Sequence, residues 1–92
     1  DTQYYRADTI DCTFNPAEET LEAAIYRLND QAEEMVRHGT VLLVLSDRHI
    51  TAERLPVPAP MIVGAVQARL VEKSLRCDAN IIVETASARD PH

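Results

Sequence analysis

The stretch Val41-Leu42-Leu43-Val44-Leu45, which runs directly into Ser46-Asp47-Arg48, decides the fold. Five consecutive leucine and β-branched residues are typical of a strand that is covered on both faces, as in a parallel sheet. Parallel strands need long connections between them, and these connections are usually helical. Helices are therefore expected in the segments on either side of this run.

A long amphipathic helix is predicted before this strand, over residues 16–38. Asn15 is a favourable N-cap, Pro16 suits the first helical position, and Glu18 stands where a capping box places a carboxylate. Gly39 suits the position that follows a helix. At 1.5 Å per residue the helix would be roughly 34 Å long. Its apolar stripe consists of Leu21, Ala24, Ile25, Leu28, Ala32, Met35 and Val36.

After the central strand, residues 49–59 are expected to form an extended loop, because Pro56 and Pro58 exclude helix there. A second helix is predicted over residues 60–76, with an apolar face wider than a surface helix needs. Gly64 lies inside it and costs about 1 kcal/mol relative to Ala. Close packing of this helix on a sheet would explain the glycine, and simple tolerance is the alternative.

Two further strands complete the predicted order. Residues 8–14 alternate in polarity, so that Ile10, Cys12 and Phe14 share one face of a half-buried, edge-type strand. Residues 81–84 form a short apolar run near the C-terminus. The fold class is therefore α/β, in the order β-α-β-α-β with parallel strands and right-handed crossovers. Such a chain is part of a (β/α) barrel or, alternatively, a small flavodoxin-like open sheet.

Composition excludes several classes of function. The formal net charge is −6 and the basic residues are scattered, which argues against a nucleic-acid partner. No apolar run approaches the ~18 residues of a membrane span, and no signal-peptide pattern opens the chain, so a cytoplasmic location is expected. Cys12 and Cys77 form no zinc spacing with the three histidines. They are interpreted as buried or half-buried thiols of a reducing compartment.

Function in either architecture collects beyond the carboxyl ends of the strands. The side chains there that could converge on one rim are Ser46, Asp47, Arg48, Glu84, Arg89 and His92. They could serve acid–base chemistry or anion binding, or simply pair to fix loops, and the second interpretation is favoured. A hydrolase that uses Ser46, Asp47 and His49 is disfavoured, because a triad draws its members from separate elements.

The chain has only two glycines, Gly39 and Gly64. Neither a Walker loop nor a dinucleotide fingerprint can be built from them. This scarcity weighs less against flavin mononucleotide, whose phosphate site in a barrel comes from late strands. No catalytic, cofactor-binding or metal-binding residue is assigned from the sequence.

Three stretches taken together resemble a known family. They are a strand ending in Ser46-Asp47-Arg48, the loop Pro56-Val57-Pro58, and residues 81–92, which contain Glu84-Thr85-Ala86-Ser87-Ala88-Arg89. In this order and spacing they are similar to the central domain of glutamate synthase large subunits, above all the bacterial NADPH-dependent enzymes. The resemblance covers nearly the whole chain.

The resemblance implies a parent enzyme that converts glutamine, 2-oxoglutarate and NADPH to two glutamates. It implies an N-terminal-cysteine glutaminase domain, an internal ammonia tunnel, and a synthase domain that holds flavin mononucleotide and an iron–sulfur cluster. NADPH would act through FAD in a small subunit. The central domain would resemble the flavin barrel but carry no cofactor, and it would link the glutaminase and synthase domains.

Carried over onto this sequence, none of that catalytic machinery falls here. Ser46, Asp47, Arg48, Glu84, Arg89 and His92 match family positions only as structural or domain-contact candidates. Residues 1–92 are interpreted as a single fragment of the central domain, because the chain opens on Asp1 and stops directly after a strand. The fragment is expected to be inactive alone and to self-associate through uncovered strand edges and helix faces. The alternative is an independent α/β module that binds a small anion near Asp47 and Arg89.

Overall fold

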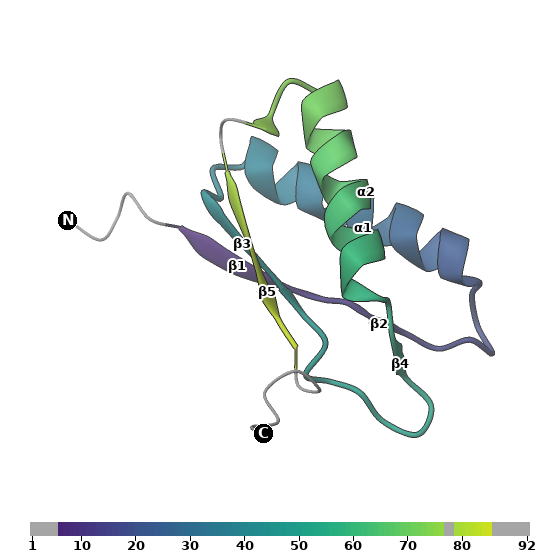
Figure 1. Ribbon diagram of the computed structural model, residues 1–92. Helices are drawn as coiled ribbons and strands as arrows, with labels where there is room; N and C mark the ends of the chain where they lie inside the picture. The colour runs from purple at the N-terminus through teal and green to yellow at the C-terminus, as the bar shows by residue number, and fades with distance from the viewer. Residues whose placement is uncertain (1–5, 77–78, 86–92) are drawn as a thin grey trace.

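The computed structural model describes residues 6–76 and 79–85. Three parallel strands form the main sheet in the order β1-β3-β5. They are β1 (Ala7–Asp11), β3 (Leu42–Ser46) and β5 (Asn80–Glu84). Helices α1 (Leu21–Arg37) and α2 (Ala59–Glu72) connect them, and both helices lie on the same side of the sheet (Figure 1). The predicted β-α-β-α-β order of an α/β chain is confirmed.

The strand order also bears on the two architectures that the sequence left open. A flavodoxin-like sheet reverses direction after its first crossover, which places helices on both faces. Here each strand lies beside the previous one, and the described strands show no reversal. Two right-handed crossovers in one direction place both helices on one face. This is the arrangement of consecutive units in a (β/α) barrel.

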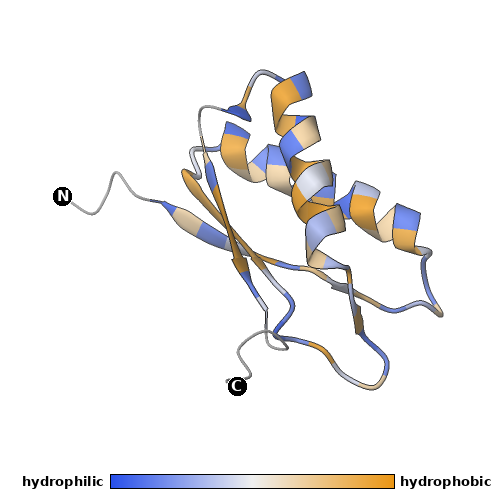
Figure 2. Ribbon diagram, viewed as in Figure 1, coloured by the Kyte–Doolittle hydropathy of each residue, from blue (hydrophilic) through white to orange (hydrophobic). Residues whose placement is uncertain are grey.

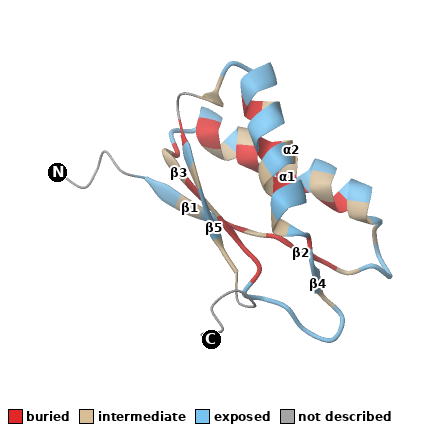
Figure 3. Ribbon diagram, viewed as in Figure 1, coloured by how far each residue is buried: buried red, intermediate tan, exposed pale blue. Residues whose placement is uncertain are grey.

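The core lies between the two helices and one face of the sheet (Figures 2 and 3). Ile10, Leu43 and Leu45 supply the sheet side, and all three are at most 2% exposed. The helices bury residues at four-residue spacing: Ala24, Leu28, Ala32 and Val36 from α1, and Ile62, Val66 and Leu70 from α2. Each fully buried Leu or Ile contributes about 2 kcal/mol through the hydrophobic effect.

The opposite face of the sheet is only partly covered by the described residues. Along β3, Leu43 and Leu45 are buried under the helices, whereas Leu42 and Val44 on the other face are half-buried. The sequence predicted a strand covered on both faces. The described part of the chain covers one of them.

Helix α1 begins later than predicted. Asn15 does cap a turn, since its Oδ1 accepts from the Ala17 amide at 2.9 Å, but that turn is not continued. Thr20 is the true N-cap, with its hydroxyl accepting from the Ala23 amide at 3.1 Å. The helix therefore has 17 residues, and the prediction that it starts at Pro16 is wrong. Its predicted end is confirmed, because Gly39 follows the cap with a positive φ of 105°.

Helix α2 ends at Glu72, four residues before the predicted end. A Schellman motif closes it: the Ser74 amide donates to the Val71 carbonyl at 3.1 Å, and the Leu75 amide to the Leu70 carbonyl at 2.7 Å. Ser74 takes the left-handed conformation, with a φ of 62°, that glycine normally supplies. The early end was not predictable from the sequence, because neither a glycine nor a proline stands at this point.

The first predicted strand is divided in two. β1 ends at Asp11 and β2 (Thr13–Phe14) follows, pairing antiparallel with β4 (Leu55–Pro56), a strand inside the predicted loop that sequence reasoning missed. Cys12 lies between β1 and β2 and bonds to both sheets. Its amide donates to the Ser46 carbonyl of β3, and its carbonyl accepts from the Val57 amide, next to β4. The predicted burial of Ile10, Cys12 and Phe14 is nevertheless confirmed.

Close packing does not explain Gly64. A Cβ at this position would meet nothing within 4 Å outside its own helix turn. The alternative offered by the sequence, simple tolerance of glycine on an exposed helix face, agrees with the structure.

Candidate functional site

The candidate site is the rim formed by the carboxyl ends of β1, β3 and β5. The strands are parallel and in register, so Asp11, Ser46 and Glu84 stand side by side across the sheet. The segments that leave the rim are the β2–β4 ribbon, the turn before α1 and the loop at 47–54 (Figure 1). The rim thus joins side chains that are far apart in the sequence.

Four of the six sequence-predicted site residues lie at this rim in the described part of the chain. The Ser46 hydroxyl is fully buried and accepts from the Arg48 amide at 3.2 Å. The Asp47 amide donates to the Glu84 carbonyl at 3.1 Å, which ties the loop to β5. The Arg48 and Glu84 side chains approach within 3.9 Å, but both are more than two-fifths exposed. An exposed ion pair of this kind contributes little to stability.

The other two predicted residues, Arg89 and His92, lie outside the described residues. A carboxylate–arginine–histidine cluster that includes them therefore stays a prediction. The same holds for an anion site that pairs Asp47 with Arg89.

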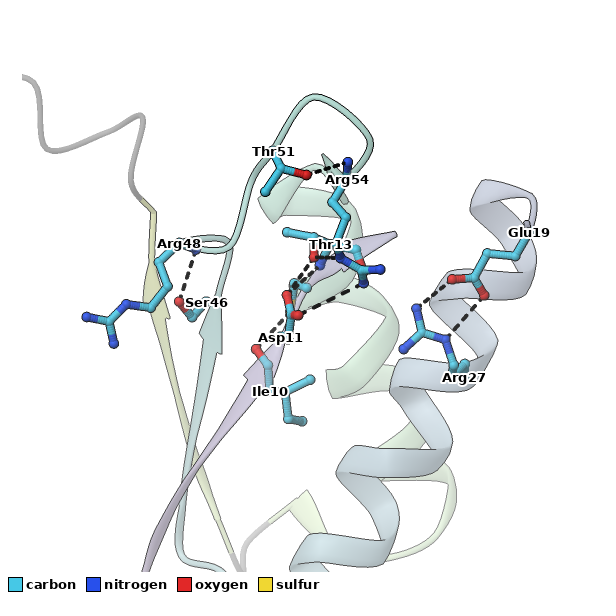
Figure 4. A network of polar contacts seen from close by, with 10 residues as sticks. Ile10, Asp11, Thr13, Glu19, Arg27, Ser46, Arg48, Thr51 and Arg54 are labelled. Atoms are coloured by element: carbon cyan, nitrogen blue, oxygen red, sulfur yellow. Dashed lines mark hydrogen bonds and ion pairs between the residues drawn. The ribbon is translucent and has the colours of Figure 1, made fainter. Parts of the chain in front are cut away.

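Sequence reasoning missed a polar contact at the rim that is made by Arg54 (Figure 4). Its guanidinium donates through Nε to the Thr13 hydroxyl and through Nη2 to the Thr13 carbonyl, both at 2.9 Å. Thr13 is fully buried, and its amide and hydroxyl donate to Asp11 Oδ1 at 3.1 and 2.7 Å. Arg54 therefore fastens the loop at 47–54 to the junction of β1 and β2. No local signal could reveal a contact between residues 41 positions apart.

A second pair, Glu19 with Arg27, lies next to this anchor (Figure 4). The Arg27 guanidinium binds the carboxylate in a bidentate manner, at 2.7 and 3.2 Å. The hydrogen bond from Arg27 holds the pKa of Glu19 below its ordinary value, and the positive charges of Arg27 and Arg54 add to this effect. The pair fastens the turn before α1 to the helix itself.

Cys12 has no reactive character. It is 3% exposed, and its thiol lies 3.6 Å from the Ile10 carbonyl. Burial raises the pKa of the thiol to about 12, and the charges of Asp11 and Asp47 act in the same direction. A thiol that stays protonated at neutral pH is a poor nucleophile and a poor metal ligand. The sequence interpretation of a buried thiol is confirmed for Cys12, and Cys77 lies outside the described residues.

The rim offers little space for a ligand. A cavity lined by Cys12, Asp47, Val57, Val83 and Glu84, among others, has a volume of about 10 Å³. That is the size of about one water molecule. Within residues 6–76 and 79–85, no three His, Cys, Asp or Glu side chains are grouped so as to hold a metal ion. No helix in the same ranges is long and apolar enough to cross a membrane.

Fold and rim together define a parallel α/β domain whose described polar side chains hold loops in place. The whole chain, residues 1–92, matches the glutamate synthase central domain. The chain belongs to this family.

Curated relatives agree with this assignment. The chain is 42% identical over 77 residues to the ferredoxin-dependent glutamate synthase of Spinacia oleracea, covering 82% of this chain and 5% of the relative. It is 34% identical over 87 residues to the NADPH glutamate synthase large chain of Bacillus subtilis, covering 95% of this chain and 6% of the relative. The corresponding large chain of Azospirillum brasilense is 33% identical over 93 residues, covering 96% of this chain and 6% of the relative. This chain thus spans only a small part of the relatives it matches.

Proposed function

We propose that this chain is a non-catalytic, connecting part of a glutamate synthase large chain, placed between its glutaminase and synthase domains. The anchoring of the rim carries the proposal. Arg54 is hydrogen-bonded to Thr13, and Arg27 is hydrogen-bonded to Glu19. We therefore assign these groups to holding the loops of the rim in position. In the described rim, the one thiol is buried and protonated.

The proposed reaction of the whole protein is the conversion of glutamine and 2-oxoglutarate to two glutamates with NADPH, in the cytoplasm. Flavin mononucleotide and the iron–sulfur cluster would belong to the synthase domain, and FAD to a small subunit. Ser46, Asp47, Arg48, Glu84, Arg89 and His92 would act as structural or domain-contact residues. Residues 1–92 would form one fragment of the central domain.

The test separates the half-reactions of the full-length large chain. Asp47→Asn and Glu84→Gln each remove a rim carboxylate with little change in shape. Glutamine hydrolysis, and reductive glutamate formation from free ammonia, should each stay within about threefold of the unmodified rate, a change of less than 1 kcal/mol in the barrier. Loss of one half-reaction by a hundredfold or more, with the other intact, would assign the carboxylate to catalysis and overturn the proposal.

Self-association of the isolated 92 residues is proposed as a consequence of removing the domain from its parent. Ile82 is 48% exposed and Val83 41% exposed on strand β5. Exposed apolar strands associate with other chains. Sedimentation velocity should show an average mass that rises with concentration, whereas a constant monomer mass at every concentration would contradict this.

A further inference from the structure

A polar groove lies between the two helices, where α1 and α2 pack together (Figure 1). It is lined by Tyr26, Asp30, Glu33, Arg69, Glu72 and Lys73. Its volume is about 350 Å³, and sites for small molecules usually measure about 300–1,000 Å³. Most such sites are lined by apolar side chains. Because five of the six residues here are charged, this groove favours a charged ligand.

Arg69 forms the fixed floor of the groove. Its Nη1 donates to Asp30 Oδ1 at 2.8 Å and to Glu33 Oε1 at 2.9 Å. The guanidinium lies over the Tyr26 ring, 5.2 Å from the centroid, and the side chain is only 12% exposed. Both oxygens of Glu33 are engaged, since Oε2 accepts from Arg37 at 3.0 Å. Arg69 and Glu33 therefore join the two helices and hold the shape of the groove.

Three charged groups around this floor can still bind a ligand. Asp30 uses only one carboxylate oxygen for Arg69 and is 60% exposed. Glu72 and Lys73 are exposed, and within the described residues their side chains make no hydrogen bond or ion pair. Neighbouring residues at the end of a helix do not face each other, so these two groups do not neutralise one another. The groove thus offers two carboxylates and one ammonium group.

This mixture of charges selects a ligand that carries both signs. A ligand with only an ammonium group would be attracted by Asp30 and Glu72 but repelled by Lys73. A ligand with only a carboxylate would be attracted by Lys73 but repelled by the two acids. Such repulsive elements are what distinguish one ligand from another. A zwitterion satisfies all three groups, and hydrogen bonds between charged groups are about twice as strong as neutral ones.

We propose that the groove between α1 and α2 binds a free α-amino acid. Its ammonium group donates to the carboxylates of Asp30 and Glu72, and its carboxylate accepts from the ammonium group of Lys73. This site is additional to the proposed connecting role, which depends on the rim at the other end of the helices. Either of the two proposals can therefore fail without the other.

Lys73 is the reporter for the test, because it is the only lysine among the 92 residues. A bound carboxylate covers the amine and keeps it protonated, so that it reacts more slowly with an acetylating reagent. The full-length large chain is acetylated briefly with and without the probe, at equal ionic strength, and mass spectrometry measures the modification of Lys73. The rate is divided by the mean rate of the other lysines of the large chain, which corrects for reagent consumed by the probe.

Three matched probes separate the two charges of the ligand. L-Alanine carries both groups, N-acetyl-L-alanine lacks the ammonium group, and L-alaninamide lacks the carboxylate. At about 50 mM, L-alanine should slow the acetylation of Lys73 at least about threefold, which corresponds to a site about two-thirds occupied. The other two probes should leave the rate nearly unchanged.

Two variants show whether the groove itself is responsible. Glu72→Gln should abolish the protection by L-alanine. Glu34→Gln should retain it, because Glu34 is 71% exposed and does not line the groove. Each variant is compared with itself with and without the probe, so that any change in the intrinsic reactivity of Lys73 cancels.

The outcomes that would overturn the proposal are distinct. If L-alanine gives no protection, the groove binds no α-amino acid. If N-acetyl-L-alanine protects equally well, Lys73 holds any carboxylate and the acids play no part. If Glu72→Gln keeps the protection, the ammonium group of the ligand is not bound at this carboxylate.

Discussion

The hydroxyl of Thr13 shows how single residues hold the rim together. It is fully buried, so it must find partners within the protein. It donates to Asp11 and accepts from Arg54, and the guanidinium also reaches Asp11 Oδ2 at 4.0 Å. The turn at 51–54 presents Arg54 in the right direction, because the Thr51 hydroxyl accepts from the Arg54 amide. One arginine thus connects a loop, a ribbon and a strand end.

Replacing this arginine tests the anchor. Arg54→Ala should lower the free energy of unfolding by about 2 kcal/mol, since hydrogen bonds to charged groups contribute 1.5–3 kcal/mol each and Arg54 is partly exposed. Urea denaturation of the domain measures the change. Arg37→Ala removes a comparable but exposed pair with Glu33, and it should cost less than about 1 kcal/mol. Equal effects of the two variants would contradict the anchoring role.

The pH dependence of the Glu19 contact is a second prediction at the residue scale. The pKa of Glu19 is lowered in the folded state from its ordinary value of 4.5. A carboxylate with a depressed folded pKa stabilises the protein above its unfolded pKa, and this contribution disappears as the pH falls through the folded value. The unmodified chain should therefore melt at a higher temperature than Glu19→Gln at about pH 6, and the difference should shrink towards about pH 3. Thermal melts at several pH values measure it, and a difference independent of pH would contradict the assignment.

Gly64 gives a third residue-scale prediction. Its Cβ would enter open space, and the residue lies inside α2. Gly64→Ala should therefore stabilise the domain by about 1 kcal/mol, through helix propensity alone. Gly39→Ala serves as the contrast, because the positive φ of 105° makes any side chain strained there. It should destabilise the domain by a similar amount. If denaturant melts show that Gly64→Ala is destabilising, the face of α2 that carries Gly64 must contact another part of the protein.

At the scale of elements, hydrophobic patterns of four or more residues predicted which helices and main strands form. Single hydrogen bonds determined the residues at which these elements begin and end. The stripe from Ala24 to Val36 predicted α1 because helical spacing is a property of the sequence itself. Its start was predicted five residues too early. Asn15 and Thr20 are both acceptable caps by residue type, and in the structure Asn15 caps only the preceding turn whereas the Thr20 hydroxyl accepts from the Ala23 amide of the helix.

The location of the candidate site was predictable from the sequence, but only some of its residues and contacts were. Strand ends of a parallel sheet share one rim, so Ser46, Asp47 and Glu84 could be located from the sequence. The β2–β4 ribbon was not predictable, because each strand has two residues and Pro56 in β4 disfavours a strand. The contact of Arg54 with Thr13 depends on that ribbon, so it was missed as well.

The position of the helix start gives the prediction at the element scale. Thr20→Ala should cost about 1 kcal/mol of unfolding free energy, because it removes the hydroxyl that accepts from the Ala23 amide. Glu18→Gln should be nearly neutral, although the sequence placed Glu18 in a capping box. Chemical denaturation of the two variants shows whether the helix is capped at Thr20 or starts earlier, at Pro16. A larger loss for Glu18→Gln than for Thr20→Ala would restore the earlier start.

At the scale of the whole molecule, one face of the sheet is covered by the two helices, and the other face is only partly covered by the described residues. The core between the helices and the sheet is closed, with Leu28, Leu43 and Leu70 completely buried. The bare sheet face and β5 leave apolar side chains in solvent. Ile82 and Val83 on β5 are among the large apolar side chains that the described residues leave exposed.

The coupling of glutamine use to glutamate formation tests the connecting role most directly. Full-length large chain with Arg54→Ala should keep glutamine hydrolysis and ammonia-dependent synthesis, which also shows that it is folded. Because the rim loop is released, it should form fewer than two glutamates for each glutamine consumed, whereas the Arg37→Ala control should keep the full yield. An unchanged yield in Arg54→Ala, or the outright loss of one half-reaction, would contradict a connecting, non-catalytic role for this domain.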